Sequence, residues 1–281
     1  MRLAALKDNS LGCITKNGLI LLSELGFSGS MLDFIITGKS KWIEINQLLK
    51  TAINKANDFD QNNLAMPLSN PPKIVAIGLN YIDHASESKM ELPKSPLVFA
   101  KFRNSITGPT DSIKIPTTVT KEVDYEVELG VVIGKTAKNV SKEEALDYVF
   151  GYTIINDVSA RDLQFGDGQW VRGKSLDTFC PTGPFIVTAD EIKDPQNLEL
   201  GCKVNGETLQ HDNTKSMIFG VAEIISKLSH TFTFEPGDII ATGTPSGVGF
   251  SRKPPIFLKN GDIVSSWIKG IGELLNPVVE I

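Results

Sequence analysis

The chain has 281 residues, 41% hydrophobic and 22% charged, which is enough to bury a sizeable core in one domain or in a main domain with an appendage. Its 28 basic and 33 acidic residues give a formal net charge of −5, which argues against nucleic-acid or anionic-membrane partners. No stretch approaches the ~20 apolar residues of a membrane span, and the N-terminus lacks the apolar core of a signal peptide. Cys13, Cys180 and Cys202 are widely spaced, which suits a reducing compartment, so a cytoplasmic location is expected.

The first 66 residues are predicted to form a small domain. Three short strands and then a helix with near-helical apolar spacing are expected: residues 1–5, 12–15, 19–22 and 42–53. Residues 67–72 (PLSNPP) are predicted to be a linker, because Pro and Asn interrupt both helices and strands. The main domain is expected to cover residues 73–281.

From residue 73 onward the pattern indicates mainly strands. Four short apolar, β-branched runs end in turn residues: 73–78, 128–134, 152–156 and 238–242. Asn260-Gly261 predicts a hairpin, since a type I′ turn needs positive φ twice. Two structural helices are expected, one from Lys142 with a capping box of Ser141 and Glu144, and one from about Ser216 to Leu228. The predicted class is α+β and rich in β-structure.

The segment Val123–Gly134 (VDYEVELGVVIG) places three carboxylates on one face of a predicted strand. Alternate residues of a strand share a face, so Asp124, Glu126 and Glu128 point the same way, about 7 Å apart along the strand. These charges repel one another unless the face is wet or a cation neutralises it. From this segment alone, a solvated face and a cation site both remain open.

Asp157 favours the cation site. It ends a second apolar strand (YTIIND), and a carboxylate at a strand end is well placed to complete a site begun by a neighbouring strand. Carboxylate oxygens select a hard cation, Mg²⁺, Mn²⁺ or Ca²⁺, over zinc. We therefore predict that Glu126, Glu128 and Asp157 hold a divalent metal and leave positions open for water or substrate.

His84 is a candidate general base within GLNYIDHASE. Glu87 can reach the imidazole if this stretch is helical, and such a carboxylate fixes the tautomer of a catalytic histidine. A lone histidine in a loop is more often structural, so both interpretations stay open. The segment between Gly78 and Pro93 is polar and short of core residues, which predicts a mobile lid.

Gly168–Ser175 (GQWVRGKS) matches the phosphate-binding pattern G-x-x-x-x-G-K-[ST]. Its context argues against a nucleotide site. The preceding DLQFGD is not a buried strand, and Pro181 and Gly183 prevent a helix of useful length after it. We expect Lys174 to lie beside the carboxylates instead.

Ala241–Gly249 (ATGTPSGVG) follows a predicted strand. Its glycines would let the backbone approach a ligand closely, and Thr244 offers a hydroxyl group. A tight surface turn explains the same pattern, so both interpretations stay open.

In chain order, six segments resemble the fumarylacetoacetate hydrolase family from about residue 73 to the C-terminus: GLNYIDHASE, DYEVELGVVIG, IINDVSARDLQ, GKSLDTFCPTGP, ATGTPSGVG and PPIFLKNGD. The resemblance implies a mixed β-roll, usually dimeric, with a small N-terminal domain. It also implies roles for the matching residues. These are metal ligation by Glu126, Glu128 and Asp157, water activation by His84 and Glu87, active-site polar contacts by Lys174, and substrate contacts by Gln164, Arg161 and Thr244.

The resemblance implies hydrolysis of a C–C bond in a 2,4-dioxo acid, of acylpyruvate, fumarylpyruvate, fumarylacetoacetate or deoxy-ketosugar acid type. His84 would deprotonate water for attack on C4, and Mg²⁺ or Mn²⁺ (Ca²⁺ in crystals) with Lys174 would stabilise the pyruvate enolate. Decarboxylation of oxaloacetate shares that enolate, so a decarboxylase, hydratase or isomerase is the alternative. A non-catalytic metal-binding protein is another, although His84, Glu87 and Lys174 together argue against it. The expected partners are a small 2-oxo acid and a second copy of the chain.

Overall fold

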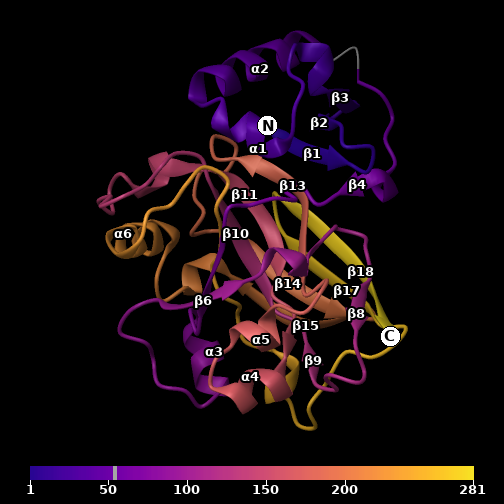
Figure 1. The fold of residues 1–281 in the computed structure, drawn as a ribbon, viewed down its shortest axis with the longest axis vertical. Helices are drawn as coiled ribbons and strands as arrows, with labels where there is room; N and C mark the ends of the chain where they lie inside the picture. Colours follow the sequence, from indigo (N-terminus) through magenta and orange to yellow (C-terminus); the bar gives the residue numbers. More distant parts are fainter. Residues whose placement is uncertain (53–55) are drawn as a thin grey trace.

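The computed structural model describes residues 1–52 and 56–281. At the N-terminus, three strands are followed by two helices and a short strand: β1 Arg2–Leu6, β2 Leu11–Thr15, β3 Gly18–Leu21, α1 Met31–Ile36, α2 Lys39–Ala52 and β4 Leu64–Ala65. Figure 1 shows these elements as a lobe at one end of the molecule. The predicted N-terminal strands are confirmed. The helix α2 covers the predicted helix as far as Ala52, and residue 53 of the predicted helix lies outside the described residues.

An eleven-stranded sheet forms the body of the protein and follows the path β3-β2-β1-β13-β11-β10-β16-β5-β6, with β4 and β7 beside it. Its remaining strands are β5 Ile74–Gly78, β6 Leu97–Lys101, β7 Ile106–Thr107, β10 Val127–Ile133, β11 Val149–Asn156, β13 Cys180–Thr188 and β16 Ile239–Ala241. The N-terminal strands join this sheet through β1, where Leu3 pairs with Ile186 of β13. The lobe and the body therefore share one hydrogen-bonded sheet, and the domain boundaries at residues 66 and 73 stay a prediction.

A second sheet of five strands packs beside the first in the order β15-β14-β17-β18-β8. Its strands are β8 Ile113–Ile115, β14 Glu199–Val204, β15 Glu207–Asn213, β17 Ile263–Ile268 and β18 Gly272–Glu280. A two-stranded ladder joins β9 Val123–Asp124 to β12 Ser159–Ala160. Apolar side chains fill both faces of the large sheet: Val131 faces the core that includes the second sheet, and Val132 faces the core shared with the N-terminal lobe.

Four further helices lie around the sheets: α3 Ile82–Glu87, α4 Arg161–Asp167, α5 Val171–Lys174 and α6 Val221–Thr231. In Figure 1, α3, α4 and α5 gather at the end of the molecule opposite the N-terminal lobe. None of the helices in the two described ranges is long and apolar enough to cross a membrane.

The structure differs from the prediction for both structural helices. Ser141 and Glu144 do bond to each other, but only the single 3-10 turn Ala145–Tyr148 follows them. The second helix begins at Val221 rather than Ser216, because the backbone amide of Ile218 is taken by the carbonyl of Asn80.

The predicted hairpin at Asn260-Gly261 is wrong. Only Gly261 has positive φ there, and residues 256–258 form no strand. β17 pairs with β14 and β18 instead.

Candidate metal centre and active site

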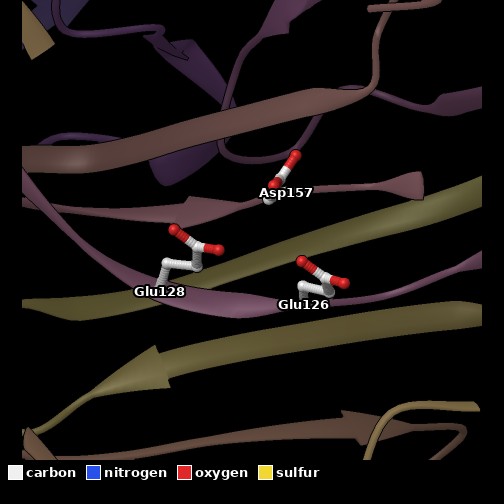
Figure 2. A group of neighbouring side chains, drawn as sticks. All are labelled: Glu126, Glu128 and Asp157. Atoms are coloured by element: carbon white, nitrogen blue, oxygen red, sulfur yellow. The ribbon is translucent and has the colours of Figure 1, made fainter. Parts of the chain in front are cut away.

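Three carboxylates converge at the open ends of two neighbouring strands. Glu126 directly precedes β10, Glu128 is the second residue of β10, and Asp157 directly follows β11. The two strands pair with Val127 opposite Asn156. One oxygen from each carboxylate lies within 4.8 Å of the others, and Figure 2 shows the three side chains on the strands that carry them. All three residues are buried, so this face of the strand is not solvated.

Three buried cations surround these carboxylates. Lys174 Nζ lies 2.7 Å from Glu126 Oε2 and 2.8 Å from Asp157 Oδ2. Arg161 Nη2 lies 2.7 Å from Glu126 Oε1, and Lys101 Nζ lies 2.5 Å from Asp157 Oδ1. Such contacts hold both carboxylates in fixed positions within a region of low dielectric constant.

Glu128 differs from its two neighbours. It accepts a hydrogen bond from the Gly243 amide at 2.8 Å, but it has no cationic partner among the residues the structure describes. Burial, and then the charges of Asp157 and Glu126, raise the pKa of Glu128 well above its ordinary value. Burial acts in the same direction on Glu126, but Lys174 and Arg161 outweigh it and lower the pKa of Glu126 to about 2.

The donor set fits a divalent cation. It consists of three carboxylates, it is buried, and one of its members lacks a neutralising charge. Hard oxygen ligands of this kind suit Mg²⁺ and Mn²⁺. Without a bound cation, keeping the Glu128 carboxylate ionised beside Glu126 and Asp157 would be costly.

Asp124, which was expected on the same strand face, leaves the cluster. The extended strand is interrupted between β9, which ends at Asp124, and β10, which begins at Val127. Asp124 Oδ2 accepts a hydrogen bond from Arg161 Nε at 2.9 Å. Its Oδ1 accepts from the amide of Gly249 at 2.7 Å. Asp124 therefore orients Arg161 and the loop after β16 rather than facing the three converging carboxylates.

His84 and Glu87 form a hydrogen-bonded pair on α3. His84 Nδ1 lies 2.9 Å from Glu87 Oε1, and no described residue bonds to Nε2, so this nitrogen can act on a ligand. Glu87 is itself fixed by the amide of Gly247 and the hydroxyl of Ser251, both of which donate to it. Burial alone raises the pKa of Glu87, but the hydrogen bonds from His84 and Gly247 lower it by a larger amount, so the net shift of the pKa is downward.

A small cavity of about 20 Å³ joins these groups. Its polar lining is made by His84, Ser88, Glu126, Glu128, Arg161, Gln164, Lys174 and Thr244. Of the predicted site residues, only Glu87 and Asp157 do not line it, and each bonds to a residue that does. The volume holds about one water molecule, so a larger ligand requires its walls to move. The mobility of the predicted lid stays a prediction.

Gln164 and Thr244 already have partners. Gln164 Oε1 accepts from Arg161 Nη1 at 2.8 Å. The Thr244 hydroxyl donates to the carbonyl of Val127 at 3.0 Å and accepts from Gln210 at 2.8 Å. These bonds leave the Gln164 amide nitrogen, but not the Thr244 hydroxyl hydrogen, free to donate to a ligand.

Lys174 ends the short helix α5, and α4 precedes that helix. The G-x-x-x-x-G-K-[ST] match therefore has neither a strand before it nor a helix after it. Gly173 has a packing reason: a Cβ there would lie 2.7 Å from the amide nitrogen of Gln164 and 2.8 Å from the carbonyl of Ala160. The glycine lets α5 approach α4 and brings Lys174 to the carboxylates.

Sequence reasoning missed several residues of the site. Lys101 ends the apolar strand β6 and donates to Asp157 and to the Lys174 carbonyl. A lone charged residue at the end of an apolar strand is the signal that identified Asp157, and it applies to Lys101 as well. The aromatic wall of the cavity, made by Phe99, Phe165, Trp170 and Phe250, carries no such signal.

Residues 73–279 match the family model described as fumarylacetoacetate (FAA) hydrolase C-terminal. The chain belongs to this family of enzymes, as the resemblance of its motifs implied, and the β-rich α+β class is confirmed.

The relatives of the chain carry names of different reactions. The chain is 46% identical over 286 residues, 97% of this chain and 93% of the relative, to "Fumarylacetoacetate hydrolase domain-containing protein 2 homolog" of Dictyostelium discoideum. It is 46% identical over 254 residues, 89% and 78% of the two chains, to "Oxaloacetate tautomerase fahd2, mitochondrial" of Xenopus laevis. Among solved structures, the chain is similar to maleylpyruvate hydrolase from Sphingobium sp. SYK-6, which was solved in complex with manganese (II) ion and pyruvate. The two superpose with a TM-score of 0.83 at 31% identity, and the match covers 100% of this chain and 99% of that one.

Proposed function

We propose that this protein is a divalent-metal-dependent enzyme that interconverts the keto and enol forms of a small 2-oxo acid, with oxaloacetate as substrate. The observation that carries the proposal is the buried cluster of Glu126, Glu128 and Asp157 beside Lys174. The relative named oxaloacetate tautomerase, 46% identical to this chain, supports the choice of substrate.

In the proposed holoenzyme, Glu126, Glu128 and Asp157 hold Mg²⁺ or Mn²⁺. When bound, the metal supplies Lewis-acid polarisation of the substrate's 2-oxo group and compensates the charge of its carboxylate. The manganese named in the maleylpyruvate hydrolase complex supports a metal of this class.

His84 is the proposed base. His84 lines the cavity, and with Nδ1 bonded to Glu87 its Nε2 is the ring atom proposed to accept the proton from C3 of the substrate. The Glu87 carboxylate stabilises the imidazolium that results. Return of this proton to the 2-oxygen gives the enol, so the reaction consumes no water and releases no fragment.

Lys174 and Arg161 supply the remaining positive charge. Lys174 Nζ lies between Glu126 and Asp157, where it can donate to a substrate oxygen that becomes negative in the transition state. Arg161 and Gln164 are proposed to bind the substrate's second carboxylate, and Thr244 to shape the turn beside it.

Hydrolysis of a C–C bond in a 2,4-dioxo acid is the second candidate. It is favoured by the same His84–Glu87 pair, which can activate water, and by the solved maleylpyruvate hydrolase. Here His84 takes a proton from water, the hydroxide attacks C4, and C3–C4 cleaves to leave an enolate that is protonated at C3.

One set of assays separates the candidates. Protein treated with EDTA and then supplied with Mg²⁺ or Mn²⁺ is mixed with enol-oxaloacetate, and loss of the enol absorbance is followed alongside pyruvate release. We expect metal-dependent loss of the enol without stoichiometric pyruvate. Pyruvate release from oxaloacetate indicates decarboxylation, and cleavage of acylpyruvates without tautomerisation supports the second candidate. Equal rates with EDTA and with added metal would refute metal dependence for either candidate reaction.

We also propose that the enzyme is a homodimer. The strand β6 lies at the edge of the large sheet and exposes Leu97 and Val98, and Phe102 follows it. An exposed apolar edge of this kind is usually covered. Light scattering on the purified protein measures the mass directly. The location in the cytoplasm stays a prediction, since the Xenopus laevis relative is named mitochondrial.

A further inference from the structure

A second cavity, of about 390 Å³, lies where α2 of the N-terminal lobe meets β11 and the segment after β13. None of the residues that line it lines the catalytic cavity. Its volume is within the range of small-molecule sites, which lies at roughly 300–1,000 Å³. Because the two cavities share no lining residue, a ligand can occupy this one whatever reaction the catalytic cavity supports.

One wall of the cavity is apolar and aromatic. Trp42 and Phe150 meet edge to face, with ring centroids 4.7 Å apart. The only donor of the indole, Nε1, bonds to the carbonyl of Phe34 at 2.9 Å, so the ring offers the cavity apolar surface. Ile43, on the next position of α2, lines the cavity while half its surface is exposed.

The rim carries more positive than negative charge. Lys39, Lys135 and Lys193 line the cavity, against Asp147 and Asp190. Within the described residues, none of these lysines has a carboxylate at ion-pair distance. Lys39 also begins α2, whose first turn contains no acidic residue, so the positive end of that helix dipole adds to the potential.

A hydroxyl group in the wall completes the cavity. Tyr152 lines it, and the residue as a whole is only 2% exposed. Its hydroxyl is not among the buried polar atoms that lack a partner in the described residues, and no described residue bonds to it, so the hydroxyl keeps contact with solvent. Burial, and then the charge of Asp194, raise the pKa of Tyr152, so the hydroxyl stays protonated and can donate. A ligand in the cavity can therefore accept a hydrogen bond from this hydroxyl.

We propose that this cavity is a binding site for an amphipathic organic anion, an aromatic or conjugated carboxylate. Its ring would pack on Trp42 and Phe150, and its carboxylate would lie at the rim lysines. A neutral apolar compound would leave the rim lysines unused, and an inorganic anion would leave the aromatic wall unused. The site would give the N-terminal lobe a role in ligand binding.

The probe is 2-naphthoate, titrated into the full-length protein by isothermal calorimetry and compared with the neutral 2-naphthamide. We expect saturable binding of the acid, and binding of the amide weaker by about tenfold, which corresponds to one charge-assisted contact. Mg²⁺ and oxalate, which the proposed catalytic site would take, should leave the naphthoate affinity unchanged.

Two variants locate the binding. Ile43→Trp adds bulk into the cavity from an exposed position, and Lys135→Gln removes one rim charge. Each is expected to weaken naphthoate binding, by about tenfold or more for Ile43→Trp, since the added ring occupies the same volume. The matched control is Ile36→Trp, at an exposed isoleucine of α1 that does not line this cavity, and it should bind as the wild type does. The proposal would be overturned if naphthoate did not bind, if the acid and the amide bound equally, or if neither Ile43→Trp nor Lys135→Gln changed the naphthoate affinity.

Discussion

Glu126 and Glu223 are each held between two cations, one in the catalytic cavity and the other on the surface of α6. Glu126 lies 2.7 Å from both Arg161 Nη2 and Lys174 Nζ. Glu223 lies 2.9 Å from Lys142 Nζ and 3.1 Å from Lys227 Nζ. The local geometry is nearly the same, whereas the side-chain exposure is 6% for Glu126 and 25% for Glu223.

Burial changes what these contacts do. In the cavity, each charge has lost its water, so removing one member leaves the others desolvated and unpaired. On α6, water and salt replace a missing partner at little cost. The buried network can therefore fix the geometry of a catalytic site, whereas the surface network contributes little beyond local helix stability.

The largest effect is expected for Glu126→Ala. The change removes a proposed metal ligand and leaves Arg161 and Lys174 facing each other without the carboxylate. Activity should be abolished, and Mn²⁺ affinity should fall by more than the about 10–100-fold typical of losing a group that only supports a ligand. Calorimetry with Mn²⁺ and the enol-oxaloacetate assay measure both. Glu126→Ala protein that binds Mn²⁺ as tightly as the wild type would contradict the assignment.

His84→Ala tests the proposed base and should separate catalysis from metal binding. The rate should fall by about 10²–10⁴-fold, the usual contribution of a general base. Metal affinity should hardly change, because His84 is not a proposed ligand. The matched control is His211→Ala, since His211 pairs with Glu199 at 2.8 Å on the surface. A near wild-type rate in His84→Ala would mean that another group is the base.

Lys101→Met measures the strength of the buried network through stability. Lys101 donates to Asp157 and to the carbonyl of Lys174, and both acceptors are buried. Losing one partner of a buried pair typically costs about 3–5 kcal/mol, and we expect the free energy of unfolding in EDTA to fall by about 3 kcal/mol, since Lys174 still pairs with Asp157. Urea denaturation measures it, with Lys7→Met, at a surface lysine 3.7 Å from Asp111, as control. Equal midpoints for the two variants would show that burial does not matter here.

The sequence predicted those parts of the molecule that depend on local pattern. The apolar runs that became β5, β10, β11 and β16 are recognisable because each is bounded by turn residues. The predicted hairpin at Asn260-Gly261 is wrong because it was inferred from two adjacent turn residues alone. The strand β17 that follows pairs with β14 and β18, and the sequence pattern around the turn does not identify these partners. Helix α4 was missed because it is short, and its first residue, Arg161, is held by ion pairs to Asp124 and Glu126 rather than by helix propensity.

The same distinction applies to the candidate site. Strand alternation and a strand end brought Glu126, Glu128 and Asp157 into one hypothesis, and the structure places them together. Alternation also predicted that Asp124 would join them, but the break between β9 and β10 turns it toward Arg161. Gln210 could not be identified from sequence: it lies on β15 of the second sheet, where its side chain bonds to Val127 and Thr244.

Glu223→Gln should have the smallest effect and completes the comparison with Glu126. The hydrogen bond from Lys142, which outweighs slight burial, lowers the pKa of Glu223. A lowered pKa in the folded state means that the charge stabilises the fold above the ordinary pKa, and that this contribution is lost as the pH falls through the folded value. At pH 7 the variant should cost only about 0.2–1 kcal/mol, and less in 1 M salt, because water and ions screen both pairs. Urea denaturation at pH 7 and at pH 3 measures the difference, with Glu143→Gln as control, since no described residue forms an ion pair with Glu143. A cost at pH 7 as large as that of Lys101→Met would remove the distinction between the two networks, because pairing geometry would then outweigh burial.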